Sequence, residues 1–154
     1  MNRLILNREF KIPADGMYHI APLGEFGHAA AAVIQVLDAE ACVAMAARFA
    51  ADAAAPNFPG LLIDFDHLSL DATPRSEAAG WIVNLEARTN TDGNGPEHGL
   101  WAQIRWSDVG EEAVKGGRYR FLSPVWSRAD CVELGMDSAS GWPRLPRPGH
   151  GSPR

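Results

Sequence analysis

The clearest helical pattern in the chain covers residues 38–55, an alanine-rich stretch whose larger apolar side chains share one face. Those side chains are Cys42, Met45 and Phe49. Asp38 is a favourable N-cap, and Glu40 places a negative charge in the first turn, where it complements the helix dipole. Two prolines follow and cannot continue a helix. The pattern therefore predicts one long helix.

After this helix the period changes from that of a helix to that of a strand. Residues 61–70 alternate, so that one face carries Ile63, Phe65 and His67 and the other carries Leu62, Asp64 and Asp66. Further strand patterns cover residues 80–86 and 99–106, and the polar, glycine-rich segment 89–98 between them is typical of a turn. This part of the chain is predicted to be sheet.

A second, shorter helix is expected at about 108–115. Ser107 can cap it, Lys115 lies near its end, and two glycines close it. A fourth strand is predicted at 118–126, and the chain before residue 38 consists of short extended pieces broken by glycine and proline. Several strands with one main helix predict an α+β fold or a β-barrel decorated by helices.

Composition fits one globular domain and argues against two function classes. The chain has 154 residues, of which 46% are hydrophobic and 21% charged, and its net charge is −5. This acidity argues against a protein that grips a phosphate backbone, so no specific nucleic-acid partner is expected. No apolar run is long enough for a membrane span, and the first ten residues do not form a secretory signal. A soluble, cytoplasmic protein is therefore expected.

The last residues differ in composition from the rest. Residues 141–154 are rich in proline and arginine and offer almost nothing to bury. We expect a folded domain at 1–140 and a disordered tail at 141–154. The two cysteines, Cys42 and Cys131, lack a CxxC spacing and are expected to be small buried side chains.

Two residues could carry chemistry. His67 lies on an otherwise apolar strand face, where it is either a satisfied core histidine or, beside a nucleophile, a general base. Ser123 replaces an expected apolar residue on the strand face of Tyr119 and Phe121, and Pro124 after it marks an edge or bulge; a surface hydroxyl is the other interpretation. Strand alternation separates His67 from Asp64 and Asp66, so no metal site is expected, and no motif indicates a cofactor.

Taken together, four segments resemble the Mu-like prophage I protein family, the phage Mu type prohead proteases that share a gene with the capsid scaffold. The segments are Asp64-Phe65-Asp66-His67, Ala78-Ala79-Gly80-Trp81-Ile82, Gly99 to Ser107, and Tyr119-Arg120-Phe121-Leu122-Ser123-Pro124-Val125. Their order and spacing match, and the resemblance covers about residues 18–135.

The resemblance implies a serine endopeptidase of phage head maturation with a fold like that of herpesvirus assemblin, a barrel-like core with surrounding helices. The family's histidine falls on His67 and its serine on Ser123. A third polar residue would orient the histidine: Glu133 is our first candidate and Asp66 the second. Arg118 or Arg120 could stabilise the oxyanion, although strand alternation favours solvated arginines there.

The expected partners are phage scaffold and capsid proteins in proheads assembling in the bacterial host cytoplasm, and dimers are expected from the resemblance. The family usually continues past the Ser-Pro strand with an Ala-Leu-Thr-Asn type segment and a scaffold region, whereas this chain runs into Gly141-Trp142-Pro143 and looks truncated or altered there. The alternative function is therefore a catalytically inactive capsid-assembly or scaffold-type protein that retains the protease fold.

Overall fold

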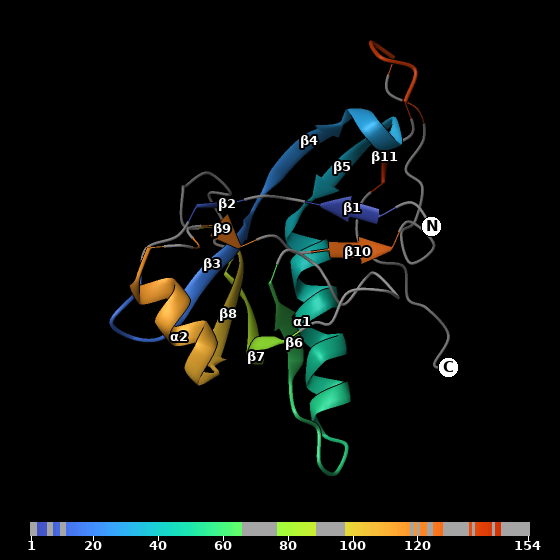
Figure 1. Cartoon of the computed structure of the whole chain (residues 1–154). Helices are drawn as coiled ribbons and strands as arrows, with labels where there is room; N and C mark the ends of the chain where they lie inside the picture. Colours follow the sequence, from blue (N-terminus) through green and yellow to red (C-terminus); the bar gives the residue numbers. More distant parts are fainter. Residues whose placement is uncertain are drawn as a thin grey trace.

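A four-stranded antiparallel sheet with the order β3-β8-β7-β6 forms the middle of the fold (Figure 1). Its strands are β3 (Met17–Pro22), β6 (Leu61–Asp64), β7 (Ala78–Arg88) and β8 (Gly99–Trp106). The structure, a computed structural model, describes residues 3–5, 8–9, 12–65, 77–88, 98–117, 119, 121–122, 125–127, 136, 138–142 and 144–145.

The strand patterns of the sequence are confirmed where the structure describes them. β8 has the predicted bounds, β6 begins at the predicted residue, and β7 is longer than predicted at both ends. The extra residues of β7 pair with both neighbours, Ala78 with Asp64 and Arg88 with Gly99, so pairing extends the strand beyond its own alternation. Residues 66–70 of the predicted first strand lie outside the described residues.

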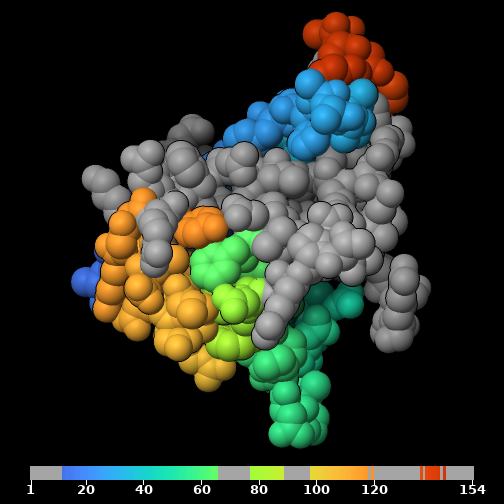
Figure 2. All heavy atoms as spheres, in the orientation of Figure 1, coloured from blue at the N-terminus to red at the C-terminus, as the bar shows by residue number. Residues whose placement is uncertain are grey.

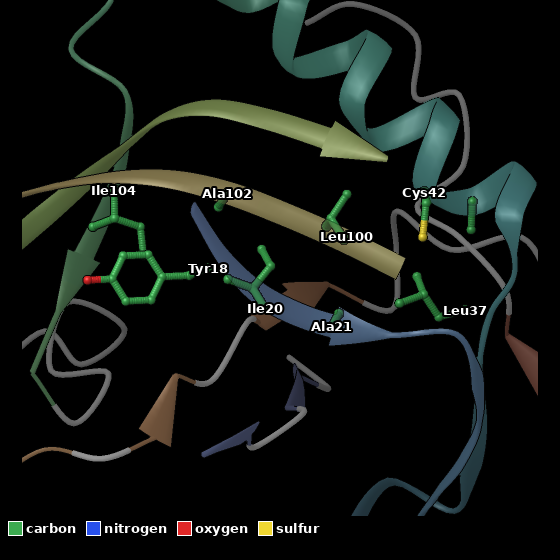
Figure 3. Packing of buried hydrophobic residues seen from close by; sticks show 9 residues of the cluster. Tyr18, Ile20, Ala21, Leu37, Cys42, Leu100, Ala102 and Ile104 are labelled. Carbon is green, nitrogen blue, oxygen red and sulfur yellow. The ribbon is translucent and has the colours of Figure 1, made fainter. Parts of the chain in front are cut away.

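The predicted long helix is α1 (Ala39–Ala53), and its cap is as expected. The carboxylate Oδ1 of Asp38 accepts a hydrogen bond from the backbone N–H of Ala41 at 2.7 Å. Cys42 and Phe49 are buried, and Met45 packs at the margin of the core. Figure 3 shows the side chain of Cys42 beside residues of the sheet. The labelled core members are Tyr18, Ile20, Ala21, Leu37, Cys42, Leu100, Ala102 and Ile104. The helix is thus held by the apolar face that its sequence predicts.

The second helix, α2 (Asp108–Lys115), is fixed to the start of β7 by its cap. The Ser107 hydroxyl accepts a hydrogen bond from Gly110 N–H at 3.1 Å and lies 2.8 Å from the carbonyl oxygen of Ala78, to which it donates. Gly110 must be glycine, because a Cβ there would lie 1.8 Å from the carbonyl oxygen of Ala79. The cap predicted from sequence is confirmed, and it also attaches the helix to the sheet.

Three strands form an arm that extends away from the four-stranded sheet (Figure 1). β4 (Gly24–His28) and β5 (Val33–Leu37) pair antiparallel and are joined through a short 3-10 helix, η1 (Ala29–Ala31). β11 (Arg144–Leu145) pairs parallel with β5, and Arg144 forms an ion pair with Glu25. The two residues of β11, Arg144 and Leu145, belong to the stretch expected to be a disordered tail. Residues 143 and 146–154 of that stretch lie outside the described residues.

The region of the predicted fourth strand contains two short strands, β9 (Phe121–Leu122) and β10 (Val125–Ser127). They pair antiparallel with β2 (Arg8–Glu9) and β1 (Arg3–Ile5). The architecture is therefore α+β and mostly strands. The described strands form four separate sheets, and the barrel-like core that was expected is not found among them, because the outer strands β3 and β6 of the largest sheet do not pair with each other.

Candidate functional site

The residues that sequence analysis nominated for catalysis lie outside the described part of the chain. They are His67, Ser123, Glu133 and Asp66, together with the oxyanion candidates Arg118 and Arg120. What the structure describes is the chain on either side of them, at Asp64 and Phe65, at Tyr119, and in β9 and β10.

An aromatic contact joins the two segments that carry the nominated pair. The rings of Phe65 and Tyr119 have centroids 4.9 Å apart and planes inclined at 48°. Phe65 comes two residues before His67, and Tyr119 comes four residues before Ser123. Both side chains are partly buried. The end of the β6 segment and the start of the β9 segment thus lie beside each other, although β7, β8 and α2 separate them in sequence.

The chain around Ser123 is held by the first residues of the protein. Phe121 and Leu122 pair with Glu9 and Arg8, and Val125 to Ser127 pair with Ile5 to Arg3. The two residue numbers of a pair have the same sum in both ladders, so the ladders share one antiparallel register. Sequence reasoning missed this role for the N-terminal residues, since strands of two and three residues are too short to show alternation.

A second group of polar and aromatic side chains lies on one face of the four-stranded sheet. The His19 ring stacks on Trp101 with centroids 4.8 Å apart, and the Arg88 guanidinium lies over the Trp101 ring at 4.2 Å. Arg88 also pairs with Glu86 at 3.4 Å, and His19 Nε2 lies 3.0 Å from the carbonyl oxygen of His98. Cross-strand contacts of this kind stabilise a solvated sheet face. They explain why these side chains lie together without assigning them a catalytic role.

Cys42 is excluded as a nucleophile. The side chain is fully buried, as the sequence predicts, and it forms no disulfide. Burial and the nearby negative charge of Asp38 raise the pKa of the thiol from its ordinary value of 9.0 to about 12. Since the thiolate is the reactive form, this cysteine is inert at neutral pH.

The hollow beside α2 is too small for most ligands. It has a volume of about 80 Å³ and lies between the sheet and α2, lined by Ile12, Tyr18, Trp106, Glu111, Val114 and Lys115. This volume is well below the ~300 Å³ at which ligand pockets begin. Among the same described residues, no group of three or more histidine, cysteine, aspartate or glutamate side chains could hold a metal ion. No helix in the part of the chain described here is long and apolar enough to cross a membrane.

Comparison with known families decides where the chain belongs. The model of the Mu-like prophage I protein, N-terminal domain, matches residues 18–134. The chain belongs to this family. No curated protein and no solved structure matches the chain.

The match to the Mu-like prophage I family covers the four-stranded sheet from Tyr18 on, the helices α1 and α2, and the nominated residues His67, Ser123 and Glu133. It leaves out β1, β2 and β11. Family membership indicates a phage-related role for the chain. The Phe65–Tyr119 contact falls inside the matched range, and the N-terminal strands that flank Ser123 fall outside it.

Proposed function

We propose that this chain is a serine endopeptidase of phage head maturation that uses Ser123 as nucleophile and His67 as general base. Its substrates are scaffold and capsid proteins in proheads assembling in the bacterial host cytoplasm, and its fold is related to that of assemblin. Two findings support the proposal: membership of the Mu-like prophage I family and the contact between Phe65 and Tyr119.

The aromatic contact is the observation that carries the proposal. Along the strand that the sequence predicts at residues 61–70, Phe65 and His67 share one face. By the same alternation Tyr119 shares a face with Ser123. The ring contact at 4.9 Å between Phe65 and Tyr119 puts the two segments side by side, which supports the proposal because a nucleophile and its base must lie close together.

The reaction is acyl transfer. The Ser123 Oγ attacks the scissile carbonyl carbon while His67 takes the hydroxyl proton, and the carbonyl oxygen becomes an oxyanion. His67 then gives the proton to the leaving amine, and the peptide C–N bond breaks to leave an acyl-enzyme. Water attacks the acyl carbon in the same way, and Ser123 regains its proton. Glu133, or Asp66 in its place, orients His67, and backbone N–H groups or Arg118 or Arg120 stabilise the oxyanion.

A fluorophosphonate probe tests the nucleophile directly. We expect labelling of the full chain, loss of labelling in Ser123→Ala and His67→Ala, and normal labelling in Ser127→Ala, a serine four residues away. Comparing labelling rates of Glu133→Gln and Asp66→Asn then identifies the orienting residue. Labelling that persists in Ser123→Ala would contradict the proposal. A folded chain that never labels and never cleaves scaffold protein would instead be the inactive assembly protein.

A further inference from the structure

The two edges of the four-stranded sheet differ in how they are protected. β3 ends at Pro22, and its pairing with β8 shifts register between His19 and Ala21; both features discourage the addition of another strand. The pairing of β6 with β7 is regular from Leu61 to Ile63 and shifts register only between Ile63 and Asp64, at the end of the strand. β6 also contains no lysine, arginine or proline. Among the described strands β6 has β7 as its only neighbour.

The β6 edge also exposes apolar side chains. Leu61 is 44% exposed and Leu62 is 52% exposed, and as successive strand residues they lie on opposite faces of the sheet. Each sits beside an apolar side chain of β7, since Leu61 pairs with Ile82 and Leu62 with Trp81. Figure 2 shows atoms of β6 (green) beside those of β7 (yellow-green) on the surface of the molecule.

The backbone at the start of β6 holds this edge in place. Gly60 has φ +102°, a conformation that favours glycine, and a Cβ there would lie 2.5 Å from the carbonyl oxygen of Ile82. The entry to β6 is therefore in close contact with β7. An edge fixed in this way presents its backbone groups without a further ordering cost when another strand pairs with it.

From these features we infer that the edge of β6 binds an extended segment of polypeptide with two successive apolar residues. Backbone hydrogen bonds would supply affinity, and Leu61 and Leu62 would contact one apolar side chain on each face of the sheet. The bound segment is a stretch of the substrate protein, because β6 leads through Phe65 to His67. This substrate role rests on the proposed protease function, whereas the binding of a strand does not.

The small size of the edge favours a transient peptide over a second copy of the chain. Two leucines at these exposures offer about as much area as one buried aromatic side chain, ~150–250 Å². A stable dimer needs ~800 Å² from each partner. A four-residue edge fits a substrate that must be released after cleavage, and not a permanent interface.

The test uses the Ser123→Ala chain, which cannot turn over substrate, and a fluorescent peptide of alternating threonine and valine with two central leucines. A matched peptide carries N-methyl groups on its central amides and cannot complete a ladder. We expect the first peptide to bind and the second not to bind. Leu62→Lys should weaken binding by about fivefold or more, since it places a charge on the edge and removes a cross-strand contact. Val43→Lys on α1 is the control, because Val43 is 54% exposed and far from the edge in sequence.

Equal binding of both peptides, or equal binding by the Leu62→Lys and Val43→Lys chains, would overturn the inference. So would sedimentation of the chain as a dimer that Leu62→Lys converts to a monomer, because the occupant would then be a second copy. Circular dichroism melting of each variant confirms that it is folded, and Leu62→Thr provides a second, strand-compatible substitution. Peptide binding that depends on Leu62, in a chain whose Ser123 is never labelled by the fluorophosphonate, would support strand binding at the β6 edge and refute the protease function. Labelling of Ser123 in a chain that binds both peptides equally would support the protease function and refute strand binding at this edge.

Discussion

Phe65 and Tyr119 lie with their ring centroids 4.9 Å apart, at the ends of two segments that are distant in sequence. Phe65 follows β6 directly, and Tyr119 lies between α2 and β9. Because neither ring is fully buried, the contact links two parts of the surface as well as adding to the core. The proposal of a dyad at His67 and Ser123 rests on this contact.

This contact should be measurable by a double-mutant cycle. Phe65→Leu and Tyr119→Leu, alone and together, should give a coupling free energy of about 0.5–1.5 kcal/mol in urea unfolding, the range for aromatic pairs. If the pair also positions the dyad, each single variant slows fluorophosphonate labelling more than its loss of stability explains. The Phe49–Phe58 pair, with centroids 5.5 Å apart, is the control, since its variants should change stability and leave labelling unchanged. Additive effects of Phe65→Leu and Tyr119→Leu would refute the coupling.

The attachment of α2 to the sheet predicts that alanine substitution at two glycines changes the free energy of unfolding by very different amounts. Gly110→Ala should lower the free energy of unfolding by about 1–3 kcal/mol, because the new methyl group meets the carbonyl oxygen of Ala79 and the helix must move. Gly27→Ala should change it by less than about 0.5 kcal/mol, since the nearest atom to a Cβ there is 3.8 Å away, in Trp142. Chemical denaturation checks both. Equal stability of the two variants would show that α2 is not in close contact with β7.

The raised pKa of Cys42 predicts how stability depends on alkaline pH. The folded chain keeps the thiol proton up to about pH 12, whereas the unfolded chain loses it near the ordinary value of 9.0. The unfolded state then binds fewer protons, so the free energy of unfolding falls as pH rises above 9, by up to about 1.4 kcal/mol per pH unit from this group. The measurement is urea unfolding from pH 8 to 10.5 in a Cys131→Ser background.

The control for this pH dependence is Cys42→Ala in the same background, which should lose stability less steeply over that range. Other groups titrate equally in both proteins, so the difference in slope isolates the thiol. Parallel slopes would mean that the Cys42 thiol ionises as readily in the folded chain as in the unfolded one.

The pairing of β11 with β5 predicts that deleting the last residues loosens β5 locally and changes the stability of the whole fold little. Deleting residues 141–154 removes a two-residue ladder and the ion pair between Glu25 and Arg144, both of whose side chains are substantially exposed. Exposed ion pairs contribute about 0–1 kcal/mol, so the melting temperature should shift little. Hydrogen exchange of the β5 amides should nevertheless accelerate. Arg144→Ala, which removes the charge alone, should leave that exchange nearly unchanged. No change in β5 exchange on deletion would show that β11 does not pair in solution.

Local rules were sufficient for the helices and for the central strands. Asp38 and Ser107 cap α1 and α2 because a short polar side chain can satisfy backbone N–H groups within three residues, an interaction contained in the sequence itself. The bounds of β8 follow from alternation between two glycine- or serine-marked ends. The nomination of His67 and Ser123 likewise came from residues alone, through alternation and the resemblance to a family that the comparison confirms.

Tertiary structure decided the rest, because the interactions involved join short pieces that are far apart in the chain. β1 and β2 pair with β10 and β9, β11 joins β5, and Phe65 meets Tyr119. β1, β2 and β11 are too short to show a period of their own, and alternation within a longer segment does not say which segment it will meet. The number of strands in each sheet, and hence the absence of a closed barrel among the described strands, also depends on this long-range pairing. The sequence by itself determined the helices, the central strands and the candidate chemistry, and only long-range packing determined which segments meet.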